Sequence, residues 1–304
     1  MNLNHAEVIA SFRNALEAVN GPLPGEVVAD GEIHRYRTDK DKRGSLNGWY
    51  VLYLDGIPSG AFGNWKTGQQ ETWCAVDREQ MTFEERATMA RHAENVRQQQ
   101  EQARKDRERR QKAVAMKVKT WWHWARPADP AHGYLQAKHV EPYGLRQDNE
   151  DGALLVPLTV NGESWVNLQR IWPNGSKRFV AGGRVRGCYS PIAGDKGGTN
   201  GPLYICEGWA TGATIRALTG HPVACAMNCG NLRPVAELLR QRYPARPLII
   251  AGDNDHHTEG NPGKTAAQET AQAVGAEWMV PSFPGGLPGT DYNDRYLLEL
   301  EGRL

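Results

Sequence analysis

Acidic side chains near the C-terminal end of the chain follow two short apolar runs. Glu207 follows the run LYIC, and Asp253 and Asp255 follow the run PLIIAG in the pattern Asp-x-Asp. Three carboxylates in one crevice repel each other, and burying them is costly unless a cation lies among them. Ligand sets made only of oxygen suit Mg²⁺ or Mn²⁺. These residues therefore predict a divalent-metal site that handles phosphate groups.

The elements that must position these acids alternate regularly along the chain. After Pro202, four apolar runs that indicate buried strands alternate with three helix-like stretches. This alternation predicts a parallel, Rossmann-like sheet. Because the carboxyl ends of the strands line the ligand crevice in such sheets, we expect the three acids to lie together at one edge.

The order of these features resembles the Toprim domain of bacterial-type primases, of type IA and II topoisomerases and of certain nucleases. A strand followed by Glu207 and a glycine, a strand–helix unit without acids, and a strand followed by Asp-x-Asp occur in that order. The resemblance implies acid–base or metal chemistry for Glu207 and Mg²⁺ or Mn²⁺ binding at Asp253 and Asp255. It also implies a later acidic ligand, which here is Asp291 or, alternatively, Asp294.

The stretch before this domain resembles the strand-rich subdomain of DnaG-type primases, in the form found in plasmids and phages. Apolar runs separated by turns at Asn161-Gly162 and Pro173-Asn174-Gly175 predict an antiparallel sheet. In that family a basic face guides template and product, whereas the alternative is a merely solvated sheet face. The candidate nucleotide-binding or DNA-binding residues here are Arg170, Lys177, Arg178, Arg184 and Arg186.

Two segments precede this subdomain. Residues 82–125 contain no Gly or Pro and many charges, which predicts one long helix that is either a solvated connector or a nucleic-acid contact. The N-terminal residues predict a helix and a small antiparallel sheet, and they resemble a segment at the front of phage and plasmid primase-helicase proteins. Basic residues interleaved with aromatics suit single-stranded DNA, although small sheets also need aromatics for their core. The candidates in this segment are Arg35, Lys42, Trp49 and Trp65.

Composition limits the possible classes of protein. The net charge is only +1, so any nucleic-acid surface must come from local clustering of charge. No apolar stretch approaches the ~20 residues that a membrane span needs. The five cysteines are an odd number, which predicts reduced thiols in a cytoplasmic protein. Cys225 and Cys229 lack a second pair of zinc ligands, and the zinc ribbon that opens cellular DnaG-type primases has no counterpart in the first 130 residues.

Two further patterns fit their motifs poorly. Residues 260–265 look like a phosphate loop, but Thr258 stands where the full pattern needs a glycine. Lys264 is instead expected near the metal site at a helix start, where it would contact nucleotide or DNA. His256 and His257 are expected to be solvated or to support the metal site.

The sequence thus predicts an α/β protein with α+β parts, divided into four regions. These are a small N-terminal α+β domain that is a possible binder of single-stranded DNA (1–80), a long charged helix (81–126), a strand-rich subdomain (127–200) and a Toprim domain (201–304). The resemblance implies a DNA primase that joins nucleoside triphosphates on single-stranded DNA, with its helicase on another chain or outside these residues. The alternatives are a Toprim-type nuclease and a non-catalytic module that binds single-stranded DNA, whereas the histidines after Asp-x-Asp argue against a topoisomerase.

Overall fold

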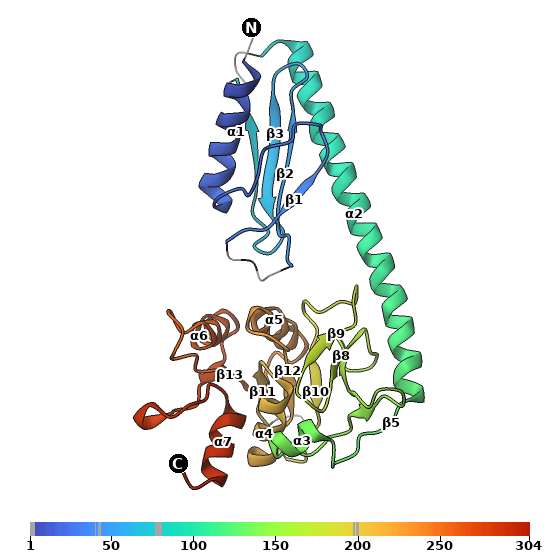
Figure 1. The fold of residues 1–304 in the computed structure, drawn as a ribbon, viewed down its shortest axis with the longest axis vertical. Coiled ribbons are helices and arrows are strands. Elements are labelled where there is room, and N and C mark those ends of the chain that lie inside the picture. The colour runs from blue at the N-terminus through green and yellow to red at the C-terminus, as the bar shows by residue number, and fades with distance from the viewer. Residues whose placement is uncertain (1–3, 40, 42–43, 77–80, 197, 199–200) are drawn as a thin grey trace. The chain divides into compact units, whose positions relative to one another are not determined.

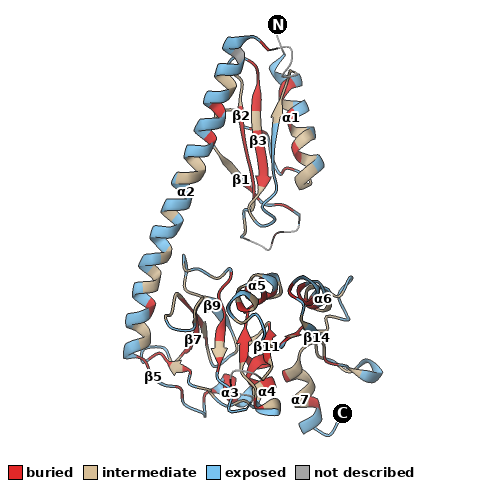
Figure 2. Cartoon of the chain, turned by 180° about the vertical axis from the view of Figure 1, so that it is seen from behind, coloured by how far each residue is buried: buried red, intermediate tan, exposed pale blue. Residues whose placement is uncertain are grey.

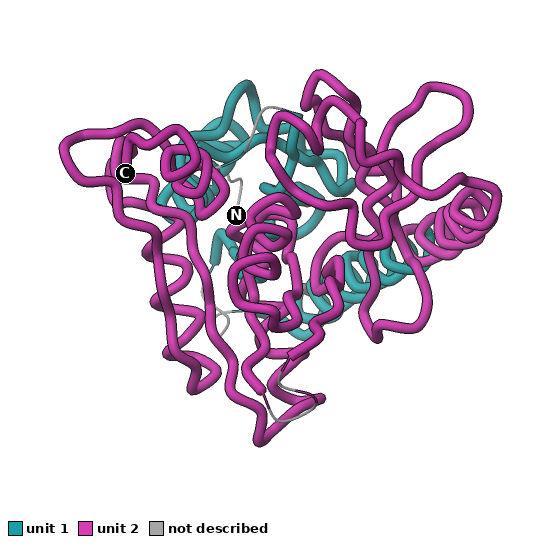
Figure 3. Tube along the Cα trace, turned by 90° about the horizontal axis from the view of Figure 1, so that it is seen from below, with its two compact units in different colours: residues 1–106 teal, residues 107–304 magenta. Residues whose placement is uncertain are grey.

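The computed structural model describes residues 4–39, 41, 44–76, 81–196, 198 and 201–304. The chain divides into two compact units, residues 1–106 and 107–304 (Figure 3). The finer division predicted at residues 80, 126 and 200 stays a proposal. None of the helices in the described ranges combines the length and the apolar character that crossing a membrane requires.

The first unit is a four-stranded antiparallel sheet with a helix on each face (Figure 1). Helix α1 (His5–Asn20) is followed by strands β1 (His34–Tyr36), β2 (Gly48–Tyr53), β3 (Ser59–Asn64) and β4 (Gln70–Cys74), which lie side by side in sequence order. Successive side chains of a strand point to opposite faces. Tyr50 and Leu52 of β2 therefore pack with Phe12 of α1, whereas Trp49 packs with Val96 of the next helix.

That next helix, α2 (Phe83–Trp124), contributes to both units and agrees with the long helix that the sequence predicts. Charged pairs one turn apart stabilise its exposed middle, such as Arg104 with Glu101 at 2.7 Å. Its last turns in the second unit present an apolar face to the next sheet, where Val118 is fully buried. Figure 2 shows this change from exposed to partly buried along the helix.

The second unit begins with a five-stranded antiparallel sheet. Its strands β5 (Arg126–Pro127), β6 (Arg146–Gln147), β7 (Leu154–Leu158), β8 (Asn167–Ile171) and β9 (Lys177–Phe179) are neighbours in sequence order, and helix α3 (Gly133–Lys138) lies between the first two in sequence. The hydrophobic residues of β7 are fully buried, because its two faces contact different clusters. The predicted strand-rich region is therefore present.

A mainly parallel sheet follows, with strand order β10-β12-β11-β13-β14. Strands β11 (Leu203–Cys206), β12 (Val223–Cys225), β13 (Leu248–Ala251) and β14 (Glu277–Met279) are parallel, and β10 (Ser190–Ile192) adds an antiparallel edge that the sequence analysis did not separate from the preceding region. The predicted parallel α/β sheet is thus confirmed.

Helices cover both faces of this sheet. Helices α5 (Leu232–Arg242) and α6 (Pro262–Val274) share one apolar cluster with alternate strand residues, including Ile205 and Ile250. Helix α4 (Trp209–Thr219) packs on the other face, where Trp209 joins Cys206 and Ala251, and it contacts the last helix, α7 (Tyr292–Leu300). Two single-turn helices, η2 (Cys229–Asn231) and η3 (Pro284–Gly286), occur in the connections.

Candidate metal centre and nucleic-acid-binding residues

Glu207 and Asp253 lie at the carboxyl ends of adjacent parallel strands. Glu207 directly follows β11, and Asp253 follows β13 after one glycine. Since Cys206 of β11 pairs in register with Ala251 of β13, the two strands end at the same level of the sheet. The chain continues from β11 to one neighbouring strand and then to the other, so this edge is also where strand order reverses. Ligand crevices of open α/β sheets form at such points.

Asp253 is the electrostatic centre of the site. Its Oδ1 atom is buried and accepts no hydrogen bond from the described residues. Burial, followed by the charges of neighbouring carboxylates, raises the pKa of its carboxyl group to about 9. In order of decreasing effect, these neighbours are Glu207, Asp291, Asp255 and Asp294. The structure thus brings the predicted acids within electrostatic reach of one another.

Asp255 is held by the start of helix α6. Its Oδ2 atom accepts a hydrogen bond from the backbone N–H of Gly263 at 2.9 Å. A Cβ atom at Gly263 would lie 2.6 Å from the carbonyl oxygen of Asp253, so only glycine permits this approach. The positive end of the helix dipole favours a carboxylate here. The segment that looked like a phosphate loop therefore binds the chain's own acid, and Lys264 is placed beside it in the first turn of α6.

Asp291 is the N-cap of helix α7. Its Oδ1 atom accepts hydrogen bonds from the backbone N–H groups of Asn293 (2.8 Å) and Asp294 (2.9 Å), and its Oδ2 atom accepts one from Thr211 Oγ1 at 3.1 Å. Asp294 lies 3.4 Å from the ammonium group of Lys138. Both oxygens of Asp291 thus already accept hydrogen bonds within the protein. Its role as the N-cap of α7 is observed, whereas its role as a metal ligand stays a prediction.

The acidic residues fit a Mg²⁺ site in which substrate phosphates supply some of the metal ligands. Within the described ranges, no group of three or more His, Cys, Asp or Glu side chains is arranged so that it could hold a metal ion by itself. Mg²⁺ in nucleotide enzymes usually takes only one or two carboxylates, with waters and substrate phosphates as its other ligands. The buried Oδ1 of Asp253 and the surrounding negative charge are what a cation would satisfy.

Among the predicted basic residues, Lys177 lies within electrostatic reach of Asp291 and Asp253. Its ammonium group lies 5.0 Å from the ring centre of the buried Tyr134. Surrounding protein lowers the pKa of Lys177, and the charges of Asp291 and Asp253 oppose that effect. The residue nevertheless keeps exposed surface. Strand β9 thus brings a cation from the antiparallel sheet to the acidic edge of the parallel sheet.

Arg170 is held by contacts within the protein. Its guanidinium group lies 2.6 Å from Asp151 and 3.2 Å from Asp148, and it stacks over Trp121 at 4.6 Å and over Trp172 at 5.0 Å. The other candidates on this side, Arg178, Arg184 and Arg186, are exposed. Their binding of nucleotide or DNA stays a prediction.

The N-terminal candidates separate into core and surface residues. Trp49 is only 2% exposed and packs against Trp65, with ring centres 5.4 Å apart. The predicted role of Trp49 in base stacking is corrected here, because a buried ring offers no face to a base. Arg35 is exposed and donates through Nε to the carbonyl oxygen of Leu46 at 3.0 Å. Lys42 lies outside the described residues.

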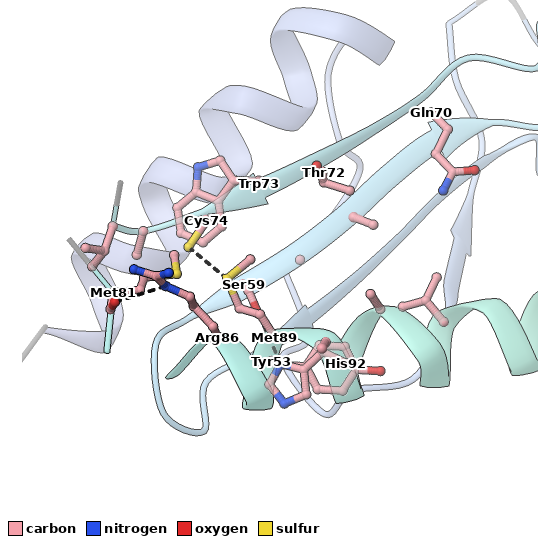
Figure 4. Close-up of a pocket in the computed structure, with 17 residues that line it drawn as sticks. Tyr53, Ser59, Gln70, Thr72, Trp73, Cys74, Met81, Arg86, Met89 and His92 are labelled. Carbon is pink, nitrogen blue, oxygen red and sulfur yellow. Dashed lines mark hydrogen bonds between the residues drawn. The ribbon is translucent and has the colours of Figure 1, made fainter. Parts of the chain in front are cut away.

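The first unit also contains a cavity of about 1110 Å³ that no sequence pattern predicts. It lies between strands β3 and β4 and the first turns of α2, and Trp73 and Met89 contribute to its lining (Figure 4). His92 ties helix to sheet there: Nδ1 lies 3.0 Å from Ser59 Oγ and Nε2 lies 3.1 Å from Asp55. His92 is 33 residues from Ser59 and 37 residues from Asp55 in sequence, so no local pattern predicts these contacts.

Asn231 is a positioning residue that the sequence analysis missed. Its side chain accepts a hydrogen bond from the N–H of Gly187 at 2.7 Å and donates to the carbonyl oxygens of Ala226 (2.7 Å) and Cys188 (2.8 Å). The adjoining turn is joined to the site, because the N–H of Met227 donates to the carbonyl oxygen of Glu207 at 2.7 Å. The signal in the sequence is only an Asn-Cys-Gly-Asn turn after an apolar run.

Comparison with known proteins agrees with this architecture. Residues 202–301 match the family model described as Toprim domain, so this part of the chain is a Toprim domain. The chain is 34% identical over 299 residues to a DNA primase TraC of Escherichia coli, which covers 91% of this chain and 27% of that protein. A second DNA primase TraC of Escherichia coli is 35% identical over 263 residues, covering 84% of this chain and 18% of that protein.

The chain is therefore a Toprim-domain relative of DNA primases, as the sequence analysis predicted, and it spans 27% or less of the length of these two relatives. The solved structures that resemble it include the primase fragment of the bacteriophage T7 primase-helicase protein. That structure has 15% sequence identity and a TM-score of 0.42, and the match covers 57% of this chain and 70% of the T7 fragment.

Proposed function

We propose that this chain is the catalytic core of a DNA primase, which joins nucleoside triphosphates into a short RNA primer on a single-stranded DNA template. The observation that carries the proposal is Asp253, a half-buried residue whose buried Oδ1 atom is unsatisfied among four other acids, in a Toprim domain whose relatives are DNA primases. Nucleotidyl transfer joins a 3′-hydroxyl to an α-phosphate and releases pyrophosphate. The α-phosphate and the departing pyrophosphate are both anionic, so the reaction requires positive charge near them.

The proposed metal ligands are Glu207, Asp253 and Asp255, with Asp291 as a further candidate, and the proposed cofactor is Mg²⁺ or Mn²⁺. When bound, the cation would supply positive charge to phosphate oxygens. The chain itself contributes the orientation of the acids: Gly263 fixes Asp255, and Thr211 fixes Asp291. Lys177 adds a cation beside the same acids, where it would contact a triphosphate.

The proposed partners are single-stranded DNA, nucleoside triphosphates and a replicative helicase on another chain or in a part of the protein outside these residues. Arg178, Arg184, Arg186 and Lys264 are proposed to contact template or nucleotide, and the first unit is proposed to contribute to DNA binding through surface residues such as Arg35. The five cysteines, which are not joined in disulfide bonds, support a cytoplasmic location for a plasmid-type or phage-type enzyme.

The test is incorporation of labelled ribonucleotides on a single-stranded template, run beside cleavage of a labelled single strand under the same conditions. We expect metal-dependent primers from the unmodified chain, none from the Glu207→Gln variant, and normal yield from the matched control Glu269→Gln, since Glu269 is an exposed residue of α6. Cleavage without incorporation would instead identify a nuclease. Binding without either reaction, unchanged in Asp253→Asn, would identify a non-catalytic module.

A further inference from the structure

Residues 109–126, which form the end of helix α2 and the start of β5, carry a local positive charge that the whole chain lacks. Between Glu108 and Asp129 the sequence contains six lysines and arginines and no acid, whereas the net charge of all 304 residues is +1. The six are Arg109, Arg110, Lys112, Lys117, Lys119 and Arg126. Such clustering is how a nearly neutral protein presents a surface to nucleic acid.

One face of this helical segment is already occupied by its own domain. Val118 and Ala125 are buried, and Val114, Trp121 and Trp122 pack with them against Leu155 of β7 and Leu168 of β8. Those helix positions recur at the three- and four-residue spacing of a single helical face. The apolar face of α2 is therefore not available to insert into a membrane or to seat on a partner helix.

The opposite face is exposed and mixes cations with large apolar side chains. Lys112, Met116, Lys119, Thr120, His123 and Trp124 form this surface, which we call the α2 stripe. Met116 is 67% exposed and Trp124 is 71% exposed, although both are residue types that usually bury their side chains. With a rise of 1.5 Å per residue, the stripe runs about 18 Å from Lys112 to Trp124.

The end of the stripe is rigidly held. Arg146 donates through Nη1 to the carbonyl oxygens of Trp122 (2.8 Å) and His123 (3.0 Å), and Asn149 donates to the carbonyl oxygen of Trp124 at 2.8 Å. These bonds satisfy the last carbonyls of the helix, and the guanidinium group adds positive charge beside them. The Trp124 ring is thus presented from a fixed backbone, with the ring of His123 at 5.0 Å.

We propose that the α2 stripe is a binding surface for single-stranded nucleic acid, with Lys112 and Lys119 at phosphates and Trp124 as a stacking platform for a base. Aromatic rings and cations in a line are the pattern that binds single strands without sequence preference. The proposed primase would use it to hold template. Binding of DNA by the α2 stripe requires neither the acidic residues nor nucleotides. It can therefore be tested independently of primer synthesis.

The experiment measures fluorescence anisotropy of a labelled 20-nucleotide oligo(dT) with the whole chain, without metal or nucleoside triphosphates, at several salt concentrations. We expect Trp124→Ala to weaken binding about tenfold, the effect of losing one stacked base. We expect the double variant Lys112→Gln/Lys119→Gln to lower the slope of log affinity against log salt by about 1.4, which is two phosphate contacts at ~0.7 each.

The matched controls are Trp278→Ala, since Trp278 is 41% exposed on β14, and the double variant Arg233→Gln/Arg295→Gln on α5 and α7. Circular dichroism confirms that each variant is folded. Affinity within twofold of the unmodified chain in Trp124→Ala, together with an unchanged salt slope in Lys112→Gln/Lys119→Gln, would overturn the proposal. Equal affinity for duplex and single strand, together with a silent Trp124→Ala, would overturn it as well, because a duplex offers phosphates but no free base to stack.

Discussion

The edge of the parallel sheet that holds Glu207 and Asp253, here called the acidic edge, differs from the aromatic sheet of the first unit. The difference is whether the candidate side chains already have interaction partners within the protein. The apolar ring of Trp49 is already packed in that sheet, since Trp49 is almost fully buried and lies against Trp65. At the acidic edge, Asp253 keeps a buried oxygen without a hydrogen-bond donor and is surrounded by charges of its own sign. A residue type that suits a function therefore indicates a site only when the fold leaves its chemistry unsatisfied.

The largest expected effect is on primer synthesis, and it distinguishes Asp253 from Asp291. Asp253→Asn removes the central carboxylate, so we expect primer synthesis to fall about a hundredfold to a thousandfold, the scale of losing a principal charge-stabilising group. Asp291→Asn keeps an oxygen that can cap α7 and should cost about tenfold or less. Initial rates of ribonucleotide incorporation measure both, and equal losses would show that Asp291 has the same role as Asp253.

The next effect concerns stability of the first unit. Trp49→Ala removes a fully packed ring, and we expect it to lower the free energy of unfolding by about 3 to 5 kcal/mol. Trp65→Ala, at a half-buried position, should cost less. Urea denaturation of the whole chain, followed by fluorescence, measures the transition of each variant. A Trp49→Ala variant with unchanged stability but weakened DNA binding would restore the stacking role that burial excludes.

For Asp253→Asn we expect the free energy of unfolding to rise, whereas it falls for Trp49→Ala. Burial and like charges make the ionised carboxylate of Asp253 unfavourable in the folded chain, so without divalent cations Asp253→Asn should raise the free energy of unfolding by about 1 to 3 kcal/mol. Thermal unfolding in EDTA measures the change. Added Mn²⁺ should stabilise the unmodified chain and leave the variant unchanged. Destabilisation by Asp253→Asn in EDTA would contradict the electrostatic account.

The smallest effect is a pH dependence in the second unit. His132 is 5% exposed, and burial lowers its pKa, with opposing contributions from Gly152 and Asp129. The unfolded chain then binds a proton more readily than the folded one, so stability is present above the unfolded pKa of about 6.5 and is lost as pH falls below it. We expect a loss of about 1 kcal/mol or less between pH 7 and pH 5.

The matched variant for that measurement is His132→Asn, whose side chain can still accept the hydrogen bond that Tyr134 N–H donates to His132 at 3.2 Å. Its unfolding free energy should vary less over the same pH range than that of the unmodified chain. Parallel pH dependence in the two proteins would assign the effect to other groups.

The parallel sheet and the edge that holds the acids could be predicted because strand, turn and acid are adjacent in sequence. Glu207 and Asp253 each directly end an apolar run, and parallel strands place such residues at one edge. The long helix could be predicted for a similar reason, since its uninterrupted run of helix formers is a local property.

The remaining features depend on contacts between distant residues. Asp255 is fixed by a backbone N–H eight residues away, and Arg170 is held by Asp148, Asp151 and two tryptophans. Whether Trp49 faces a core or solvent depends on which helix covers its side of the sheet. A one-residue change of strand register would reverse that face, so alternation in the sequence alone does not decide it.

The most direct test of the central claim is binding of Mn²⁺ by the chain without substrate, followed by electron paramagnetic resonance of the free ion. We predict one site in the unmodified chain, at least tenfold weaker binding in both Glu207→Gln and Asp253→Asn, and unchanged binding in Glu269→Gln. Unaltered Mn²⁺ affinity in both Glu207→Gln and Asp253→Asn would contradict the claim that these acids form the metal centre.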